Sequence, residues 1–429
     1  MRRPLLIAAL LAALPSPVAA DEPPPYPFAG PPLAAPTLQL TGGQWFDGAV
    51  FRPMHWYAVD GRLTQRRPAR IDATIDLAGR HVIPPLAEAH AHDLQNGHHA
   101  GKMARNYMAR GIFYTVQLAG LPADIAPYRD FLGQPGSVDA AFSEALLSAS
   151  DGHPLAMILD SAGPMGETLT PEAARDRFYW SIDSAADLDA KWSRIAAARP
   201  KMIKVILIDS ANYAANRRKP ELFGRNGIDP ALVPEIVRRT RGVGARLIAH
   251  ADTAADFKVA ADGGADVVAH LPGYRIGRFN APADYRIDDA TIAAAARRGV
   301  TVITTTAASR FAIQRQPETR AAITANYRDN IRRLRAAGVK LALGSDSFGG
   351  SVLDEIESVD RLNVMPRAEL LRVATSDTPQ LMFPGRAIGA FREGAEASLL
   401  ALDGNPIDDL GALKRVRIAV KQGELLGGR

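Results

Sequence analysis

Short apolar runs recur along the middle of the chain and alternate with longer stretches rich in Ala and Arg. The runs are nearly continuous in apolar character, which is typical of parallel strands buried on both faces. The pattern therefore predicts strands at residues 81–86, 111–118, 155–160, 202–208, 246–250, 266–270, 300–306 and 340–344.

Helices are expected between these strands, because several Ala- and Arg-rich stretches end at a Gly, a common helix stop. They are residues 230–242, 254–263, 288–298 and 318–337. Eight strands with intervening helices favour an α/β fold, a (β/α)8 barrel of the TIM type. A doubly wound open sheet is the alternative, but the chain has no dinucleotide- or phosphate-binding glycine motif that would support it.

Both flanks of this middle region have a different pattern. Residues 37–77, 398–402 and 416–425 contain short alternating runs with turn signals such as Asp60-Gly61. We therefore expect a small β-sandwich built from residues 37–80 and 386–429, around a barrel formed by residues 81–385.

The start of the chain predicts export. Residues 1–20 combine an arginine pair, a short apolar run and a small-residue exit, the pattern of a cleaved signal peptide. A membrane anchor is the alternative, although the run is shorter than the ~20 residues that span a bilayer. Residues 21–36 are rich in proline and predict an extended leader. The mature protein is thus expected to be secreted or periplasmic, with no stable membrane span after cleavage.

Composition narrows the chemistry further. The chain has 429 residues, no cysteine and a net charge of +5. The absence of cysteine excludes disulfides, thiolate metal sites and a cysteine nucleophile, so any metal must be held by His, carboxylate or modified Lys. The small charge, without a Lys/Arg block, argues against a nucleic-acid partner. A small-molecule substrate is expected, and a homo-oligomer stays open.

Histidines supply the candidate metal ligands. His90 and His92 are two residues apart in an extended segment, so both imidazoles point to the same side. They follow an apolar strand, and chemistry in (β/α)8 barrels lies at the carboxyl ends of the strands. His250, His270 and Asp346 also stand at the exits of apolar strands. This shared position predicts one metal site rather than separate hydrogen-bonded side chains.

Lys204 interrupts an otherwise apolar strand, MIKVILI. One interpretation is a lysine that points outward and extends between helices to solvent. The other is a buried lysine whose depressed pKa lets it react with carbon dioxide, giving a carbamate that can bridge two metal ions. The strand pattern alone leaves both open.

Five motifs in this order resemble the amidohydrolase superfamily, and more narrowly its exported prolidase-like and imidazolonepropionase-like members: HVIPPLAEAHAHD, MIKVILIDS, RLIAHADT, DVVAHLPG and LALGSDSFGG. Pro85 and Glu88 stand where the family commonly has Gly and Asp. The resemblance implies that one or two divalent metals are bound by His90, His92, Lys204, His250, His270 and Asp346, with Lys204 carbamylated.

The implied chemistry is hydrolysis of a carbon–nitrogen bond in an amide, cyclic amide or dipeptide-like substrate. Two ions, zinc first and manganese, cobalt or iron as alternatives, would acidify a bridging water to a hydroxide nucleophile. Asp346 is the expected catalytic residue that passes the proton to the leaving amine.

Three other functions are weighed against the same six candidate ligand positions. A mononuclear deaminase-like hydrolase would leave Lys204 uninvolved, and a lactone or ester hydrolase would use the same centre. A non-catalytic scaffold is disfavoured because all six ligand positions are retained. Substrate contacts are expected from loops at the same end of the barrel, with His153, Tyr213, Tyr274 and Arg275 as candidates and Arg275 as a carboxylate clamp.

Overall fold

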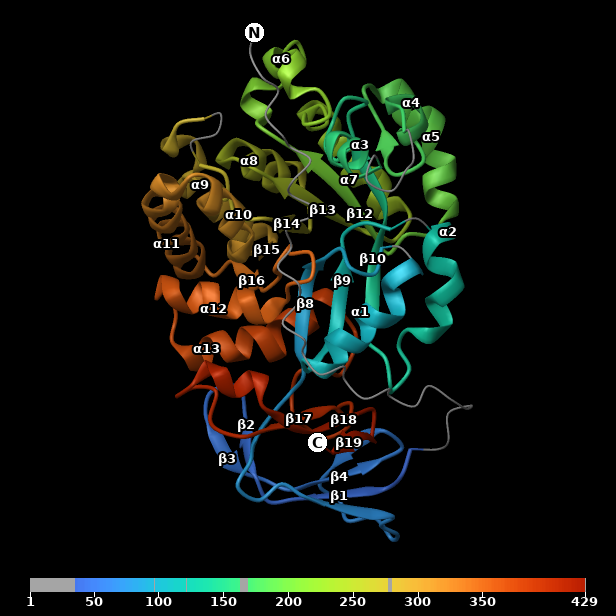
Figure 1. Ribbon diagram of the computed structural model, residues 1–429, viewed down its shortest axis with the longest axis vertical. Coiled ribbons are helices and arrows are strands. Elements are labelled where there is room, and N and C mark those ends of the chain that lie inside the picture. The colour runs from blue at the N-terminus through green and yellow to red at the C-terminus, as the bar shows by residue number, and fades with distance from the viewer. Residues whose placement is uncertain (1–34, 96, 121, 163–168, 277–279, 429) are drawn as a thin grey trace.

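The computed structural model describes residues 35–95, 97–120, 122–162, 169–276 and 280–428, in which a barrel stands on a smaller β-sandwich (Figure 1). The predicted signal peptide, residues 1–20, and nearly all of the predicted leader, residues 21–36, lie outside the described residues. In the described part of the chain, no helix has both the length and the apolar character needed to cross a membrane.

Eight parallel strands form the barrel, as predicted. The ring closes between its first and last strands, where the Ala89 N–H donates to the Leu343 carbonyl at 3.0 Å and the Asp346 N–H to the His90 carbonyl at 2.9 Å. In ring order the strands are β8 (Leu86–Ala91), β9 (Ile112–Gln117), β10 (Asp139–Ser148), β12 (Met202–Leu207), β13 (Arg246–Ala251), β14 (Val267–Ala269), β15 (Thr301–Ile303) and β16 (Lys340–Ala342). A short strand, β11 (Trp180–Ser181), pairs with β10 outside this ring.

One predicted strand was wrong, and another was wrong in part. Residues 155–160 belong to a helix, α3 (Leu155–Ala162), and the third barrel strand is β10 instead. A short apolar run does not by itself distinguish a strand from a buried helix. Residues 81–86 are divided by Pro84-Pro85 into β7 (His81–Ile83) of the sandwich and the start of β8, because proline has no N–H to continue a strand ladder.

Helices surround the barrel (Figure 1). Two of the predicted helices end as expected: α8 stops before Gly264 and α9 before Gly299, and both glycines have positive φ, 92° and 70°. The helices are α1 (Gly97–Ala109), α2 (Pro122–Ile125), α3, α4 (Pro171–Ala174), α5 (Ala185–Ala197), α6 (Tyr213–Asn216), α7 (Val233–Gly242), α8 (Ala254–Gly263), α9 (Asp289–Arg298), α10 (Ser309–Arg315), α11 (Arg320–Ala336), α12 (Val352–Leu362), α13 (Arg367–Arg372) and α14 (Thr378–Met382).

Both ends of the described chain build the sandwich, as the flanking patterns predicted. Its two sheets run β5-β4-β1-β6 and β19-β18-β17-β7-β2-β3. Leu40 and Trp45 pack in one core with Leu399 and Val420, so neither flank buries its apolar face alone. The strands are β1 (Leu38–Thr41), β2 (Gln44–Phe46), β3 (Phe51–Pro53), β4 (Trp56–Val59), β5 (Arg62–Thr64), β6 (Ala73–Asp76), β17 (Leu399–Leu402), β18 (Val416–Lys421) and β19 (Glu424–Gly428).

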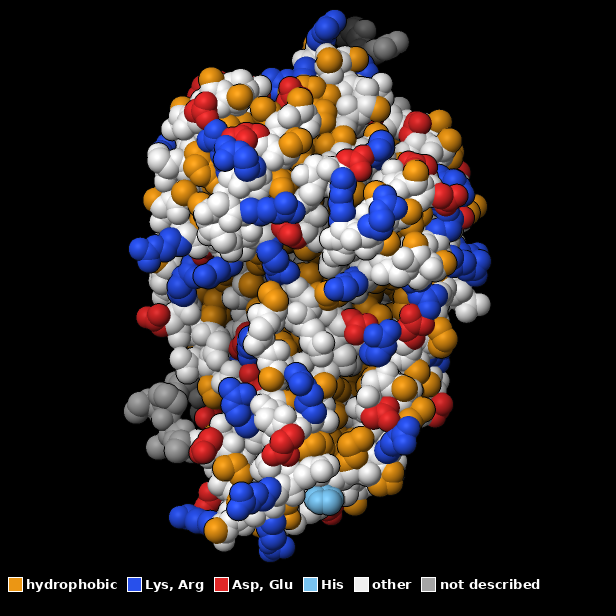
Figure 2. All heavy atoms as spheres, turned by 180° about the vertical axis from the view of Figure 1, so that it is seen from behind, with side chains coloured by type: hydrophobic (Ala, Val, Ile, Leu, Met, Phe, Trp, Pro, Cys, Tyr) orange, Lys and Arg blue, Asp and Glu red, His pale blue; other side chains and the backbone are white. Residues whose placement is uncertain are grey.

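A buried lysine joins the sandwich to the barrel. The Nζ of Lys421, on β18, donates to Asp139 Oδ1 at 2.5 Å and to the Ser137 carbonyl at 2.5 Å. Arg386 pairs with the other oxygen of Asp139 at 2.5 Å. Away from this contact, Lys and Arg side chains are interspersed with Asp and Glu on the face seen in Figure 2.

Candidate metal centre

His90 and His92 are placed by the carboxyl end of β8. His90 is fully buried on the strand, and His92, just beyond it, is half-buried. The Glu88 carboxylate accepts the backbone N–H of His90 and that of Ser345, each at 2.9 Å. One buried side chain therefore ties the segment that carries both histidines to the segment that carries Asp346.

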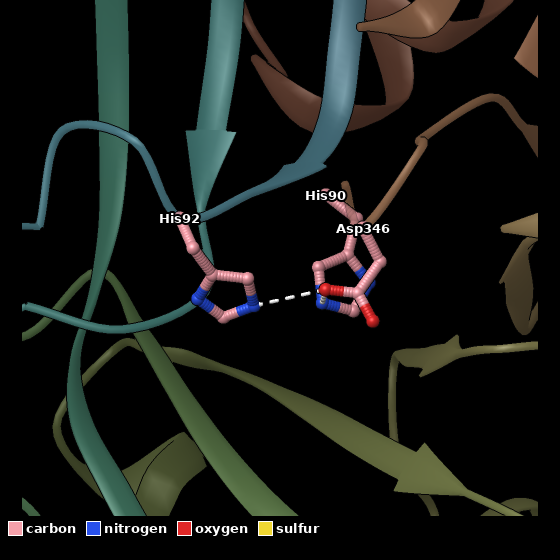
Figure 3. Close-up of side chains that lie close together, drawn as sticks. All are labelled: His90, His92 and Asp346. Atoms are coloured by element: carbon pink, nitrogen blue, oxygen red, sulfur yellow. Dashed lines mark ion pairs between the residues drawn. The ribbon is translucent and has the colours of Figure 1, made fainter. Parts of the chain in front are cut away.

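Asp346 faces three imidazoles. Its Oδ1 lies 3.1 Å from His92 Nε2 and 3.5 Å from His90 Nε2, and its Oδ2 lies 3.4 Å from His270 Nε2. One ligand atom each from His90, His92 and Asp346 fits within 4.8 Å, a spacing that a single metal ion can span. Figure 3 shows these three side chains converging from two neighbouring segments.

Lys204 points into the barrel. The side chain is 3% exposed, and its Nζ lies 3.3 Å from His90 Nε2. Burial lowers the pKa of the Lys204 ammonium to about 8, although the negative charge of Asp346 acts to raise it. The outward-pointing interpretation of this lysine is therefore wrong, because its nitrogen lies among the candidate ligands.

His250, on β13, and His270, just after β14, complete the cluster. Their ring centroids are 4.4 Å apart, and the centroid of His270 is 4.7 Å from that of His90. Both side chains are buried. The structure thus brings all six predicted ligands to the carboxyl end of the barrel.

Hydrogen bonds from outside the cluster orient three of the four imidazoles. Gln95 Oε1 contacts His92 Nδ1 at 3.1 Å, Asp252 Oδ1 contacts His250 Nε2 at 2.8 Å, and Thr305 Oγ1 contacts His270 Nδ1 at 2.9 Å. Each contact occupies one ring nitrogen and leaves the other for a metal, the arrangement typical of metal-binding histidines. Nδ1 of His90, by contrast, is buried without a partner in the described part of the chain.

Two imidazoles of the cluster are in the neutral state that can coordinate a metal cation. Burial lowers the pKa of His90 and that of His270 well below the usual range, so both rings are neutral and retain a lone pair for coordination. Oriented neutral imidazoles with one carboxylate and a buried amine form a donor set that fits zinc or a similar divalent metal.

Asp252 is a site residue that the sequence reasoning missed. It accepts a hydrogen bond from the Tyr274 hydroxyl at 2.6 Å in addition to its contact with His250. Burial disfavours its charge, but the hydrogen bond with His250 and the nearby Arg275 hold the pKa of Asp252 well below its usual range. Its position two residues after His250, on the same side of an extended segment, was a signal that could have identified it.

Left-handed backbone occurs at two candidate ligands, where φ is 81° for His270 and 46° for Asp346. Residues other than glycine rarely adopt this conformation unless surrounding contacts enforce it. Thr305, which orients His270, also has a positive φ of 44°. The buried carboxylate of Glu355 accepts the N–H groups of Thr306 and Ala307 at 2.9 and 2.7 Å and so anchors that loop.

Three of the four predicted substrate contacts lie beside the cluster. The His153 ring stacks on His250 at 5.8 Å, Tyr274 stacks on His270 at 5.1 Å, and the Arg275 guanidinium lies 4.8 Å from the Tyr274 ring centroid. Tyr213 is the exception. Its ring contacts Arg217 on the same short helical segment, with the guanidinium 5.9 Å from the ring centroid.

Comparisons with known proteins support the fold. No family model matches the chain. A curated relative, the ochratoxinase of Aspergillus niger, is 34% identical over 97 residues, which make up 21% of this chain and 20% of that protein. The match thus spans about a fifth of the relative's length.

Solved structures match along nearly the whole chain. Ochratoxinase of A. niger superposes with a TM-score of 0.71 and 18% identity, covering 92% of this chain and 97% of that one. A prolidase complexed with N-methylphosphonate-L-proline gives a TM-score of 0.69 and 20% identity over 92% and 100% of the two chains. Phenylurea hydrolase B superposes with a TM-score of 0.68 and 16% identity, covering 91% of this chain and 96% of that one.

The barrel and the sandwich made from both flanks are shared with these solved structures. The resemblance predicted from the sequence motifs is therefore confirmed at the level of the fold, and the solved neighbours named above are hydrolases.

Proposed function

We propose that the protein is an exported, metal-dependent amidohydrolase that breaks a carbon–nitrogen bond in an amide, cyclic amide or dipeptide-like substrate. The observation that carries the proposal is the convergence of a buried lysine, four imidazoles and one carboxylate at the carboxyl end of the barrel. Amide hydrolysis needs an activated water, a polarised carbonyl and a proton carrier, and this donor set can supply all three.

Two divalent ions, zinc first, are the proposed cofactors. His90, His92 and Asp346 would hold one ion, His250 and His270 the other, and Lys204 as a carbamate would contribute to both. When bound, the ions supply a hydroxide nucleophile and polarise the scissile carbonyl.

Lys204 forms the carbamate through its neutral amine. The nitrogen lone pair attacks carbon dioxide, a carbon–nitrogen bond forms, and the displaced proton leaves through a neighbouring base. The product replaces a buried cation by a buried anion. This exchange favours metal binding, because an ammonium 3.3 Å from an imidazole would repel a second cation.

Asp346 is the proposed proton carrier. Its two oxygens face imidazoles on both sides, and its side chain retains 22% exposure, so one oxygen can reach an attacking water. The carboxylate would accept the water's proton and return it to the leaving amine, as a general base and then a general acid.

Arg275 is the proposed clamp for a substrate carboxylate. It forms no ion pair within the described ranges, although its guanidinium sits over Tyr274 beside the cluster. A positive charge without a carboxylate partner can bind the free carboxylate of a dipeptide-like substrate through paired hydrogen bonds. His153 and Tyr274 would line the same side of the site.

A mononuclear, deaminase-like hydrolase is the second candidate. Its support is the tight His90, His92 and Asp346 group, whose ligand atoms lie within 4.8 Å and fit one ion without Lys204. Isotopically labelled bicarbonate distinguishes the two, because a carbamate on Lys204 gives a carbon resonance that is absent from the Lys204→Ala variant.

Substrate profiling tests the activity. The zinc-loaded protein would be assayed against dipeptides, N-acyl amino acids, cyclic amides and lactones, before and after chelation. The proposal predicts chelator-sensitive cleavage of at least one amide class. Cleavage of lactones alone, or amide cleavage unaffected by complete metal removal, would contradict it.

A further inference from the structure

Several large apolar side chains are exposed on segments that follow barrel strands. In the described part of the chain they are Met157 after β10, Phe223 after β12, Phe311 after β15 and Phe348 after β16, each between 42% and 55% exposed. Exposure alone assigns none of them a role, but an exposed ring that also contacts the candidate metal centre is placed to meet a ligand there.

Phe348 is the member of this group that contacts the candidate metal centre. Its ring stacks on His92 with centroids 5.6 Å apart and planes 27° apart. The side chain is 55% exposed, the largest exposure in the group. One face of the ring is therefore fixed against a candidate ligand, while much of the side chain stays open to solvent.

The loop that carries Phe348 is anchored on both sides of the ring. The Gly349 N–H donates to Asp93 Oδ1 at 3.2 Å, and the Tyr107 hydroxyl holds the other oxygen of Asp93 at 2.7 Å. On the amino side, the Asp346 N–H is bonded to the His90 carbonyl. These bonds hold the exposed ring in place without burying it in the core.

A continuous series of contacts leads from Phe348 to Arg275. The ring centroids are 5.6 Å apart for Phe348 and His92, 5.3 Å for His92 and His90, 4.7 Å for His90 and His270, and 5.1 Å for His270 and Tyr274. The Arg275 guanidinium lies 4.8 Å from the Tyr274 ring centroid. The candidate centre thus has a flat apolar group at one end of the series and, at the other, a guanidinium that forms no ion pair among the described residues, a polarity that orients a substrate.

We propose that Phe348 is a specificity-determining residue that stacks on a flat, apolar group on the acyl side of the scissile bond. Arg275 then holds the carboxylate on the amine side, and the amide lies between them over the imidazoles. The preferred substrate class is an N-aroyl amino acid or a dipeptide with an aromatic first residue. This role rests on the proposed amide hydrolysis.

A matched substrate pair tests the role. N-benzoylglycine and N-acetylglycine share the carboxylate and the amide and differ only in the acyl group. For each, kcat/KM would be measured with the wild type, Phe348→Ala, Phe348→Leu and the control Phe311→Ala, whose ring is also exposed after a barrel strand. Calorimetric binding of both compounds to the metal-depleted proteins gives a second readout that needs no turnover.

The wild type is expected to prefer the benzoyl compound. Phe348→Ala should lower the benzoyl-to-acetyl ratio of kcat/KM about tenfold, mainly through KM, with a matching loss in binding, because one aromatic contact contributes about that factor. Phe348→Leu should lower this ratio less than Phe348→Ala does, and Phe311→Ala should keep the wild-type ratio.

An unchanged ratio in Phe348→Ala, with active enzyme and unchanged relative binding, would overturn the role of Phe348 and leave the proposed function intact. A wild type that cleaves no amide of any class would instead contradict the proposed function, and the role of Phe348 with it.

Discussion

The Nζ of Lys204 lies 3.3 Å from Nε2 of His90, although 114 residues separate them in the chain. The two side chains come from β12 and β8, on different sides of the barrel, and both are buried. The contact joins no opposite charges, so its stabilisation is limited to one hydrogen bond between a buried amine and an imidazole. Under the proposed function, both residues would help to bind a cation once Lys204 is modified.

Removal of the lysine should separate metal binding from folding. Lys204→Ala is expected to lower kcat by about 100-fold or more while leaving the thermal unfolding midpoint of the metal-free protein unchanged or higher, because a buried amine is removed. Lys201→Ala, an exposed lysine just before the same strand, is the matched control and should behave as the wild type. A Lys204→Ala enzyme with the wild-type kcat would exclude a catalytic role for the lysine.

Reactivation of the metal-free enzyme should depend on pH through the same amine. Only the neutral amine attacks carbon dioxide, and burial lowers the pKa of Lys204 to about 8. At a fixed concentration of dissolved carbon dioxide, the rate of reactivation by zinc should rise with pH up to about 8 and level off above it. A rate that is independent of carbon dioxide, or that keeps rising toward the ordinary lysine value of 10.5, would disagree with this account.

Asp252 should act by positioning His250. Asp252→Asn keeps the shape of the side chain but weakens the bond that orients the imidazole, so zinc affinity or kcat is expected to fall about 10- to 100-fold. Competition with a chromogenic chelator measures the affinity directly. Asp262→Asn, in an exposed pair with Lys258, should leave zinc affinity unchanged. Equal affinities in the two variants would show that the Asp252 contact does not support the metal.

Lys421 should matter for stability and not for metal binding. Lys421→Met leaves Asp139 and the Ser137 carbonyl buried with one partner fewer, which is expected to lower the free energy of unfolding by about 3 kcal/mol. Denaturant titration followed by intrinsic fluorescence measures this loss, and metal analysis of the folded fraction should match the wild type. A variant as stable as the wild type would show that this ionic contact does not hold the sandwich to the barrel.

Local features made the convergence of the candidate ligands predictable from sequence. His90 and His92 have the spacing of side chains that share one face of a strand, and His250, His270 and Asp346 directly follow apolar runs. Position at a strand end is enough to bring such residues together, because the carboxyl ends of all strands meet at one end of a closed barrel.

Features that depend on tertiary packing could not be predicted as well from the sequence. The third strand, β10, contains buried polar residues such as Ser143 and Glu144, which hid its apolar character, while the more apolar residues 155–160 form a helix. Thr305 orients His270 only because its loop is anchored by Glu355, 50 residues further along the chain. The contact of Phe348 with His92 likewise arises from the loop bonds to Asp93 and has no periodic signal.

The number of metal ions per chain decides whether Lys204 helps to hold a pair of cations. Inductively coupled plasma mass spectrometry would be applied to the purified wild type and to Lys204→Ala, each expressed with zinc and bicarbonate. Two divalent ions per chain are expected in the wild type and at most one in the variant. A wild type without stoichiometric divalent metal, or a variant that retains both ions, would contradict this expectation.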